Sequence, residues 1–157
     1  KDCHPFGKSG FDPVKNIKFK RITSSYIKKL RYKNLYRDLP DSLADYKEDN
    51  YPNTKHYAIL KNQSLVSALT IIESTTNKKK SAQLRGMFTV QKELKKGYGS
   101  LLIDKVSFKL KKENINLLWC NSRINVIDFY KKNKFKEIGK TFSINLLGDH
   151  KKLIRKL

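Results

Sequence analysis

The sequence predicts an α/β domain in which helices cover the faces of a mixed β-sheet. Stretches of alternating apolar and polar residues, typical of half-buried strands, take turns with stretches whose apolar residues recur at helical spacing. The chain has 157 residues, 38% of them hydrophobic, which is enough for one buried core. No internal repeat or change of composition marks a second domain. We therefore expect an N-terminal extension at residues 1–16 and one domain at residues 17–157.

The first half of the domain reads as a strand, a helix, a loop and a hairpin. The strand IKFKRIT alternates apolar and basic side chains, and Ser24 and Ser25 after it are good helix caps. Two prolines and several Asp and Asn residues then indicate a long loop or short helical turns. Asn62 and Gln63 separate two apolar strands at the length of a hairpin turn. The expected elements are a strand at 17–23, a helix at 24–36, the loop at 37–54 and strands at 55–61 and 64–73.

The second half adds two helices between strands. In the first of these helices Leu102, Val106 and Leu110 recur at the spacing of one buried face. The segment INLLWCNS is apolar enough for a central strand, and the polar segment 74–80 reads as a link between strands. The expected elements are strands at 82–90, 115–122, 136–144 and 150–157 and helices at 98–113 and 124–132.

The positive charge of the chain indicates which classes of partner it attracts. With 35 Lys and Arg against 14 Asp and Glu, the formal net charge is +21, which attracts nucleic acids, anionic membranes and acidic cofactors. The lysines are dispersed, apart from NKKKS at 77–81, and no nucleic-acid recognition motif accompanies them. We expect only weak, sequence-independent binding of nucleic acid, and a compositional bias toward lysine is an equally good explanation of the charge.

Neither a membrane segment nor a metal site is predicted. No stretch is as long and apolar as a membrane span, and the N-terminus has no apolar core of a signal peptide, so we expect a cytoplasmic protein without a membrane partner. Cys3 and Cys120 are too few for a disulfide framework and lack the spacing of metal ligands. Cys120 follows the apolar residues LLW and is expected to be a small buried residue rather than a nucleophile.

The segment LRGMFTVQKELKKGYGSLLIDKV, residues 84–106, carries the first functional signal. A strand there runs into a turn with Gly97 and Gly99, and a helix starts at the turn. Glycines let a ligand approach the backbone closely, and a helix start presents unpaired N–H groups, so the turn is suited to a phosphate, toward which Lys95 and Lys96 add attraction. The spacing differs from that of a P-loop and of the dinucleotide-binding fingerprint. From this segment alone, a plain connection is the more common explanation.

A second segment, NSRINVIDFYKKNKF at residues 121–135, gives the turn its context. Together the two segments resemble the GNAT superfamily of N-acetyltransferases, in which a strand of the type RGMAV leads into a glycine-containing loop and a later helix carries Asn, then FY, then GF. The resemblance extends over nearly all of residues 17–157, and the end of the chain, with Gly-x-His before a last strand, resembles one subgroup. Two positions depart from the pattern: Leu94 stands where the family has Gln or Arg, and Lys134 where it usually has Gly.

The resemblance implies a GNAT fold, with a central mixed and mostly antiparallel twisted sheet flanked by helices, and acetyl-CoA as the acyl donor. It implies that the pantetheine arm lies along the strand residues Met87, Phe88 and Thr89. It places the pyrophosphate in a cradle formed by Lys95, Lys96, Gly97, Tyr98, Gly99 and Ser100. Because Leu94 cannot donate a hydrogen bond from its side chain, we expect weaker or rearranged cofactor contacts there. Asn125 is implied to contact the cofactor, with a helix cap as the equal alternative.

The resemblance makes Tyr130 the candidate catalytic residue. Acetyl transfer from a thioester to an amine needs a neutral amine and a proton for the departing thiolate, and a tyrosine at this position of the family often serves the thiolate. From spacing alone Tyr130 would be a packing residue beside Phe129. The base is less defined: Glu73 at the end of a strand is the candidate, while His56 and His150 are more often structural.

The expected function is therefore that of an N-acetyltransferase, which transfers an acetyl group from acetyl-CoA to a primary amine. The acceptor stays open among small amines, aminoglycoside-like sugars, peptide N-termini and lysine side chains, although the positive charge disfavours a polycationic acceptor. The alternatives are a non-catalytic basic module of the same fold that holds nucleic acid or another polyanion, and the same enzyme with another acyl donor. A monomer or a homodimer is expected.

Overall fold

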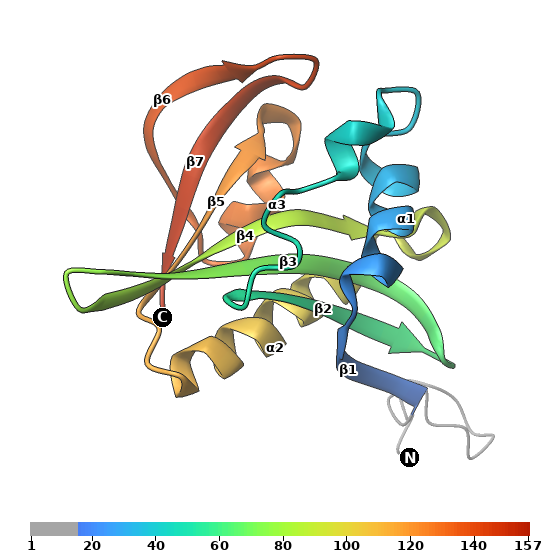
Figure 1. The fold of residues 1–157 in the computed structure, drawn as a ribbon, viewed down its shortest axis with the longest axis horizontal. Helices are drawn as coiled ribbons and strands as arrows, with labels where there is room; N and C mark the ends of the chain where they lie inside the picture. The colour runs from blue at the N-terminus through green and yellow to red at the C-terminus, as the bar shows by residue number, and fades with distance from the viewer. Residues whose placement is uncertain (1–15) are drawn as a thin grey trace, which may run out of the picture.

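The computed structural model describes residues 16–157, in which seven strands form one sheet in the order β1-β2-β3-β4-β5-β7-β6 (Figure 1). Every neighbouring pair is antiparallel except β4 and β5, which are parallel. The predicted mixed and mostly antiparallel sheet is confirmed. The expected extension at 1–16 lies outside the described residues apart from Asn16. The strands are β1 (Ile17–Ile22), β2 (Thr54–Lys61), β3 (Ser64–Thr76), β4 (Lys79–Thr89), β5 (Leu117–Arg123), β6 (Lys136–Ile144) and β7 (Gly148–Lys156).

The alternation of side chains in the strands decides which helix covers which face. In β2, Tyr57 and Ile59 pack with the residues of α2 and α3, whereas Ala58 between them packs with Ile27 of α1. Helix α1 therefore covers one face of the sheet, and α2 and α3 cover the other (Figure 1). The helices are α1 (Ser24–Leu35), α2 (Tyr98–Lys112) and α3 (Ile127–Lys132), with short 3-10 helices η2 (Asp41–Ala44), η3 (Gln91–Glu93) and η4 (Ile124–Val126).

The N-cap residue of α1 lies one residue earlier than the sequence suggested. The Thr23 hydroxyl accepts a hydrogen bond from the Tyr26 backbone N–H at 3.3 Å, so Thr23 is the cap. The Ser24 hydroxyl instead donates to the Asn50 side chain at 2.7 Å. The expected cap at Ser24 or Ser25 is thus wrong, because Ser24 ties the helix to the following loop.

Tight turns join β2 to β3 and β3 to β4. Asn62 and Gln63 have positive φ angles of 50° and 69°, as a two-residue hairpin turn requires, and the predicted hairpin is confirmed. The polar segment 74–80, expected as a link, is itself a hairpin with Asn77 and Lys78 at φ angles of 52° and 63°. Its polar residues form strands because the ladder uses backbone groups and both strands there extend beyond the core.

β4 and β5 are paired only near their N-terminal ends. Their register covers residues 81–83 of β4 and 117–119 of β5 and stops there. Beyond this point the two strands diverge (Figure 1). We call residues 84–89 of β4 and 120–123 of β5 the β4–β5 fork. β4 still pairs with β3, and β5 with β7, on their outer edges, so the inner edges of the fork have no strand partner among the described residues.

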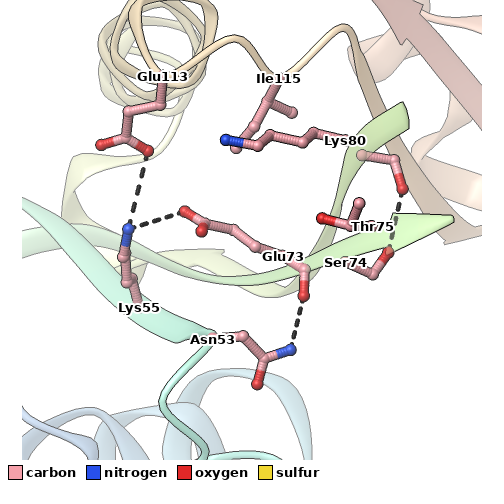
Figure 2. Close-up of a pocket in the computed structure, with 9 residues that line it drawn as sticks. Asn53, Lys55, Glu73, Ser74, Thr75, Lys80, Glu113 and Ile115 are labelled. Atoms are coloured by element: carbon pink, nitrogen blue, oxygen red, sulfur yellow. Dashed lines mark hydrogen bonds and ion pairs between the residues drawn. The ribbon is translucent and has the colours of Figure 1, made fainter. Parts of the chain in front are cut away.

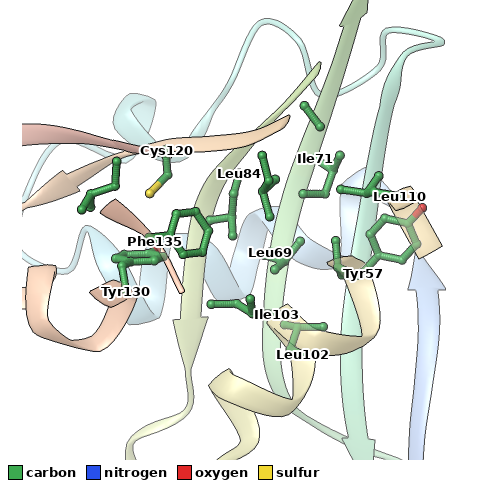
Figure 3. Packing of buried hydrophobic residues seen from close by; sticks show 14 of the residues in the cluster. Tyr57, Leu69, Ile71, Leu84, Leu102, Ile103, Leu110, Cys120, Tyr130 and Phe135 are labelled. Atoms are coloured by element: carbon green, nitrogen blue, oxygen red, sulfur yellow. The ribbon is translucent and has the colours of Figure 1, made fainter. Parts of the chain in front are cut away.

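A cluster of buried apolar side chains fills the sheet face under α2 and α3 (Figure 3). Near the fork, this cluster includes Leu84, Cys120, Tyr130 and Phe135. Burial raises the pKa of the Cys120 thiol to about 12, which keeps it protonated and confirms that it is a packing residue. No helix within residues 16–157 is long and apolar enough to cross a membrane.

Candidate active site

A bulge in β4 shapes one side of the fork. The register with β3 slips between Ala68 and Thr70, so that β4 has one residue more than its partner. Gly86 in this bulge has a φ of +59°, and a Cβ there would lie 2.8 Å from the Tyr46 hydroxyl oxygen. Glycine is therefore required at this position, and its lack of a side chain brings Tyr46 against the β4 backbone.

The three residues expected along a pantetheine arm point their side chains above and below the sheet. Met87 packs with the core cluster under α2, and Phe88 is buried with residues of α1. The Thr89 hydroxyl lies 3.1 Å from that of Ser67 on β3. What these residues offer to the fork is the backbone edge that β5 no longer pairs. An edge of this kind binds the amide groups of an extended ligand, so these residues fit a pantetheine arm.

The turn before α2 presents backbone N–H groups outward. Gly97 is its N-cap residue with a φ of +86°, and nothing lies within 4 Å of the position of a Cβ there. Leu101 donates the first helical hydrogen bond to the Gly97 carbonyl oxygen at 3.0 Å, so the N–H groups of residues 98–100 have no partner within the helix. Such a helix start attracts anions. The predicted cradle residues lie in this turn (Lys95, Lys96 and Gly97) and in the first turn of α2 (Tyr98, Gly99 and Ser100).

A carboxylate that the sequence analysis missed lies in the same turn. Glu93 is buried, and its carboxylate lies 3.1 Å from Lys96 Nζ and 3.5 Å from Lys61 Nζ. The hydrogen bond from Lys96 holds the pKa of Glu93 below its usual value. Lys96 is thereby fixed at the turn, while Lys95 has no ion pair with a described residue. The i,i+3 spacing of Glu93 and Lys96 was the signal that could have predicted this pair.

Tyr130 of α3 lies under the fork, in the buried cluster that includes Leu84 and Cys120 (Figure 3). Its ring meets those of Phe129 and Phe135 edge-on, with centroids 5.3 Å away in both cases. Burial, and then the neighbouring Cys120 and Tyr46, raise the pKa of Tyr130 above its ordinary value. The phenol therefore keeps its proton at neutral pH. Tyr130 packs as its spacing suggested, and its protonated phenol is able to donate a hydrogen bond.

Asn125 precedes α3 without capping it. Val126 occupies the N-cap position of α3, and no side chain makes a capping hydrogen bond there. Asn125 is exposed within η4, directly after the end of β5. The helix-cap alternative for Asn125 is thus wrong, and its contact with the cofactor stays a prediction.

Glu73 lies apart from the other predicted site residues. It is opposite Ala82, in the stretch where β4 is still paired with β5, which is the closed end of the fork. Its carboxylate lines a separate cavity of about 610 Å³ and lies 2.9 Å from Lys55 Nζ (Figure 2). Lys55 also lies 3.7 Å from Glu113 (Figure 2). Glu73 is therefore part of a local ion-pair network, and the structure does not bring it together with Tyr130.

The two candidate histidines differ in their free lone pairs. Both ring nitrogens of His56 are bonded: Nε2 donates to the Asp49 carbonyl oxygen at 3.1 Å, and Nδ1 accepts from Thr70 at 2.8 Å. Burial lowers the pKa of His56, so it stays neutral. His150 donates from Nδ1 to the Gly148 carbonyl oxygen at 2.8 Å, which leaves Nε2 as an acceptor. In the described part of the chain, no group of three or more His, Cys, Asp or Glu side chains is arranged to hold a metal ion.

Five side chains that the sequence did not mark as functional connect the two sides of the fork on the α1 face. We call Arg31, Tyr36, Tyr46, Arg85 and Arg123 the Tyr–Arg cluster. The Tyr46 ring lies between the guanidinium groups of Arg31 and Arg85, each 3.8 Å from its centroid. The Tyr46 and Tyr36 hydroxyl oxygens are 2.6 Å apart. Arg123, at the end of β5, lies 5.8 Å from the Tyr36 ring centroid.

Arg31 is the anchor of this cluster. It is fully buried and bonds both carboxylate oxygens of Asp49, at 2.9 Å and 3.0 Å. It also donates to the Ala44 carbonyl oxygen at 2.7 Å and to the Thr70 hydroxyl at 2.8 Å. An arginine in the lysine-rich segment of α1 gives no sequence signal for such a site, because its carboxylate partner lies eighteen residues further along the chain.

The other two arginines of the cluster differ in their partners. Arg85 lies 3.1 Å from the Glu48 carboxylate. Arg123 donates one hydrogen bond, to the Leu35 carbonyl oxygen at 3.1 Å, and has no acidic partner among residues 16–157. Burial, followed by the nearby Tyr36, raises the pKa of Tyr46, so the Tyr46 phenol keeps its proton. The cluster thus contains one cation that no carboxylate neutralises.

Comparison with known proteins agrees with this arrangement. The model of the acetyltransferase (GNAT) family matches residues 23–135. An uncharacterized N-acetyltransferase of Bacillus subtilis (strain 168), YitI, is 30% identical over 108 residues, which are 67% of this chain and 72% of that protein. A GNAT-family acetyltransferase of Staphylococcus aureus Mu50 has a TM-score of 0.69 at 22% identity, covering 90% of this chain and 99% of that one. A chain of the NatC complex bound to Gag peptide and CoA has a TM-score of 0.73 at 18% identity, with coverage of 90% and 99%. Since the matched residues include the fork, the turn before α2 and Tyr130, the chain belongs to the acetyltransferase (GNAT) family and is an acyltransferase.

Proposed function

We propose that the chain transfers an acetyl group from acetyl-CoA to a primary amine, with Tyr130 as the proton donor to the departing sulfur. The observation that carries this proposal is the β4–β5 fork. An unpaired strand edge leads there to a turn rich in free N–H groups, and a neutral phenol lies under the fork. The three features suit, in turn, the pantetheine amides, the pyrophosphate and the thioester of an acyl-CoA.

Each part of the donor has a matching group on the chain. The turn at residues 95–100 holds the pyrophosphate through its backbone N–H groups, aided by the unpaired Lys95. The backbone of residues 87–89 pairs with the arm, and Asn125 contacts the cofactor at the open end of β5. The exposed Leu94 adds no hydrogen bond, so the backbone carries the contact. The CoA bound to the NatC complex, a structural neighbour, supports this class of ligand.

Acetyl-CoA supplies the acetyl group as a thioester. The amine nitrogen forms a bond to the carbonyl carbon, the carbon–sulfur bond breaks, the nitrogen loses one proton and the sulfur gains one. Tyr130 donates the proton to sulfur and regains one from solvent. His150 accepts the proton of the amine. It is opposite Arg123 in the β5–β7 ladder, at the open end of the fork, and its Nε2 has no hydrogen-bond partner among the described residues. His150 thus replaces Glu73 as the proposed base.

Binding of acetyl-CoA is expected to raise the melting temperature. At a ligand concentration about 100 times Kd, binding to the folded state adds about 2.7 kcal/mol, or roughly 5 to 10 °C for a chain of this length. Gly97→Val should abolish the rise, because valine disfavours the left-handed φ that aims the N–H groups. The measurement is thermal unfolding at increasing concentrations of acetyl-CoA.

Gly139→Val is the matched control for this experiment. Gly139 in β6 also has a positive φ, of +74°, and open space around a Cβ, but it lies outside the fork. Both variants should melt earlier than the wild type from the same backbone strain, and only Gly139→Val should keep the rise with acetyl-CoA. An unchanged wild-type melting curve in saturating acetyl-CoA would falsify the proposed donor.

The alternative, a basic module that holds nucleic acid, predicts a different result. We expect a Kd of about 10⁻⁴ to 10⁻⁶ M for duplex DNA at physiological salt, a steep loss of affinity as salt rises and no preference for sequence. The measurement is a fluorescence anisotropy titration with two unrelated duplexes at several salt concentrations. Tight binding to one duplex over the other would favour the binding module over the enzyme.

A further inference from the structure

The Tyr–Arg cluster lies on the α1 face of the fork. On the opposite face, apolar residues such as Leu84 and Phe135 and the helices α2 and α3 fill the space under the sheet. On the α1 face, polar groups reach from Gly86, beside the Tyr46 hydroxyl, to Arg123 at the end of β5. An amine that approaches the fork from the α1 side therefore meets this cluster.

The charge balance of the cluster favours an acceptor with a negative group. The carboxylates of Asp49 and Glu48 are engaged by Arg31 and Arg85, so neither is free to bind a second ammonium group. Arg123 is only partly buried and uses one hydrogen bond on a backbone oxygen, which leaves further guanidinium N–H groups for a ligand. A guanidinium group of this kind pairs well with a carboxylate or a phosphate.

The two tyrosine hydroxyls supply the other end of the acceptor site. Their mutual hydrogen bond of 2.6 Å leaves oxygen lone pairs that accept from an amine N–H. Tyr46 lies against Gly86 in the β4 bulge, next to the backbone edge of the fork. The Arg123 guanidinium carbon lies 5.8 Å from the centroid of the Tyr36 ring, whose hydroxyl belongs to this pair. The two binding groups are thus as far apart as the ends of a small molecule.

We propose that the acceptor is a small amine that carries an anionic group, a carboxylate or a phosphate, a few bonds from its nitrogen. Arg123 binds the anionic group, and the Tyr36–Tyr46 hydroxyl pair positions the amine at the bulge of β4. This inference rests on the proposed function and names its substrate class. Polyamines do not fit, because the cluster has no free carboxylate for their second cation and has a free guanidinium group instead.

The test compares amines in pairs that differ only in the anionic group. The pairs are L-phenylalanine with phenethylamine and O-phosphoethanolamine with ethanolamine, assayed by thiol release from acetyl-CoA. The wild type should prefer the anionic member of at least one pair by about 10- to 100-fold in kcat/KM, the effect of a charge-assisted hydrogen bond. The pair that shows the preference distinguishes a carboxylate from a phosphate. Arg123→Gln should remove the preference, and Arg21→Gln, an exposed arginine of β1, should keep it.

A binding measurement makes the test independent of turnover. Calorimetric titration of each anionic amine into protein saturated with CoA should give binding for the wild type and Arg21→Gln, and weaker binding by about 10-fold or more for Arg123→Gln. Equal kcat/KM within both pairs, or a preference that Arg123→Gln retains, overturns the inference while thiol release upholds the acetyltransferase. If neither anionic amine binds or reacts, the inference is also wrong, whatever the melting curves with acetyl-CoA show.

Discussion

Replacement of Tyr130 by phenylalanine is expected to lower turnover by roughly 10²- to 10⁴-fold, the usual range for a lost acid–base group. The change removes the hydroxyl and keeps the ring between Phe129 and Phe135, so the core should stay intact. Because the pKa of Tyr130 is raised, the wild-type phenol is protonated from about pH 6 to 9, and the loss should appear throughout this range. The measurement is steady-state thiol release, beside a binding titration with acetyl-CoA.

Tyr57→Phe is the matched control. Tyr57 belongs to the same buried cluster, and its hydroxyl has no hydrogen-bond partner among the described residues. Removing that hydroxyl should leave turnover, donor affinity and melting temperature almost unchanged. Wild-type turnover in Tyr130→Phe would make Tyr130 a packing residue only. A joint loss of donor binding and of folding in that variant would mean that its hydroxyl is structural.

Arg31→Met is expected to have the largest effect on stability, a loss of about 3 to 5 kcal/mol in the free energy of unfolding. The substitution leaves the Asp49 carboxylate buried without its guanidinium partner and removes the bonds to Ala44 and Thr70. For a chain of this length, the melting temperature should fall by roughly 6 to 20 °C. Urea denaturation followed by circular dichroism measures the free energy directly.

Two further variants separate the buried pair from a general charge effect. Lys28 forms an ion pair with Asp45 on the surface, and Lys28→Met should change stability by at most about 1 kcal/mol. In the double variant Arg31→Met with Asp49→Leu, no charge stays buried alone, so a large part of the loss should be recovered. If Arg31→Met lowered the free energy of unfolding as little as Lys28→Met, Arg31 would not be the residue that anchors the Tyr–Arg cluster.

The sequence patterns located the elements well because each depends on neighbouring residues. The strand at 136–144 agrees with β6, and the helix at 98–113 ends one residue beyond α2. The hairpin at 74–80 was missed because polar residues obscured the strand pattern beyond the core. Local patterns could not predict the order of the strands in the sheet. The parallel contact of β4 with β5, which creates the fork, joins segments that α2 separates in the sequence.

In the candidate site too, residues within one continuous motif were predicted, and residues that only folding brings together were missed. The turn at 95–100 and Tyr130 were predicted because each lies in a continuous motif. Glu73 was a plausible base in the sequence, yet its place on the β3–β4 ladder puts it at the closed end of the fork. The Tyr–Arg cluster was missed since its members come from α1, a loop, β4 and β5, and only folding brings them together.

The three-residue contact between β4 and β5 has a mechanical consequence for the proposed binding of the acyl donor. Strands β1–β4 and β5–β7–β6 are two antiparallel blocks that share only three register pairs. An arm paired with the β4 edge acts as an additional strand in the fork, so amide hydrogens on that edge should exchange more slowly with the donor bound. In the proposed reaction, CoA still occupies this position after transfer. Product release then requires the protein to give up a strand of its own sheet, a step that can limit the rate of turnover.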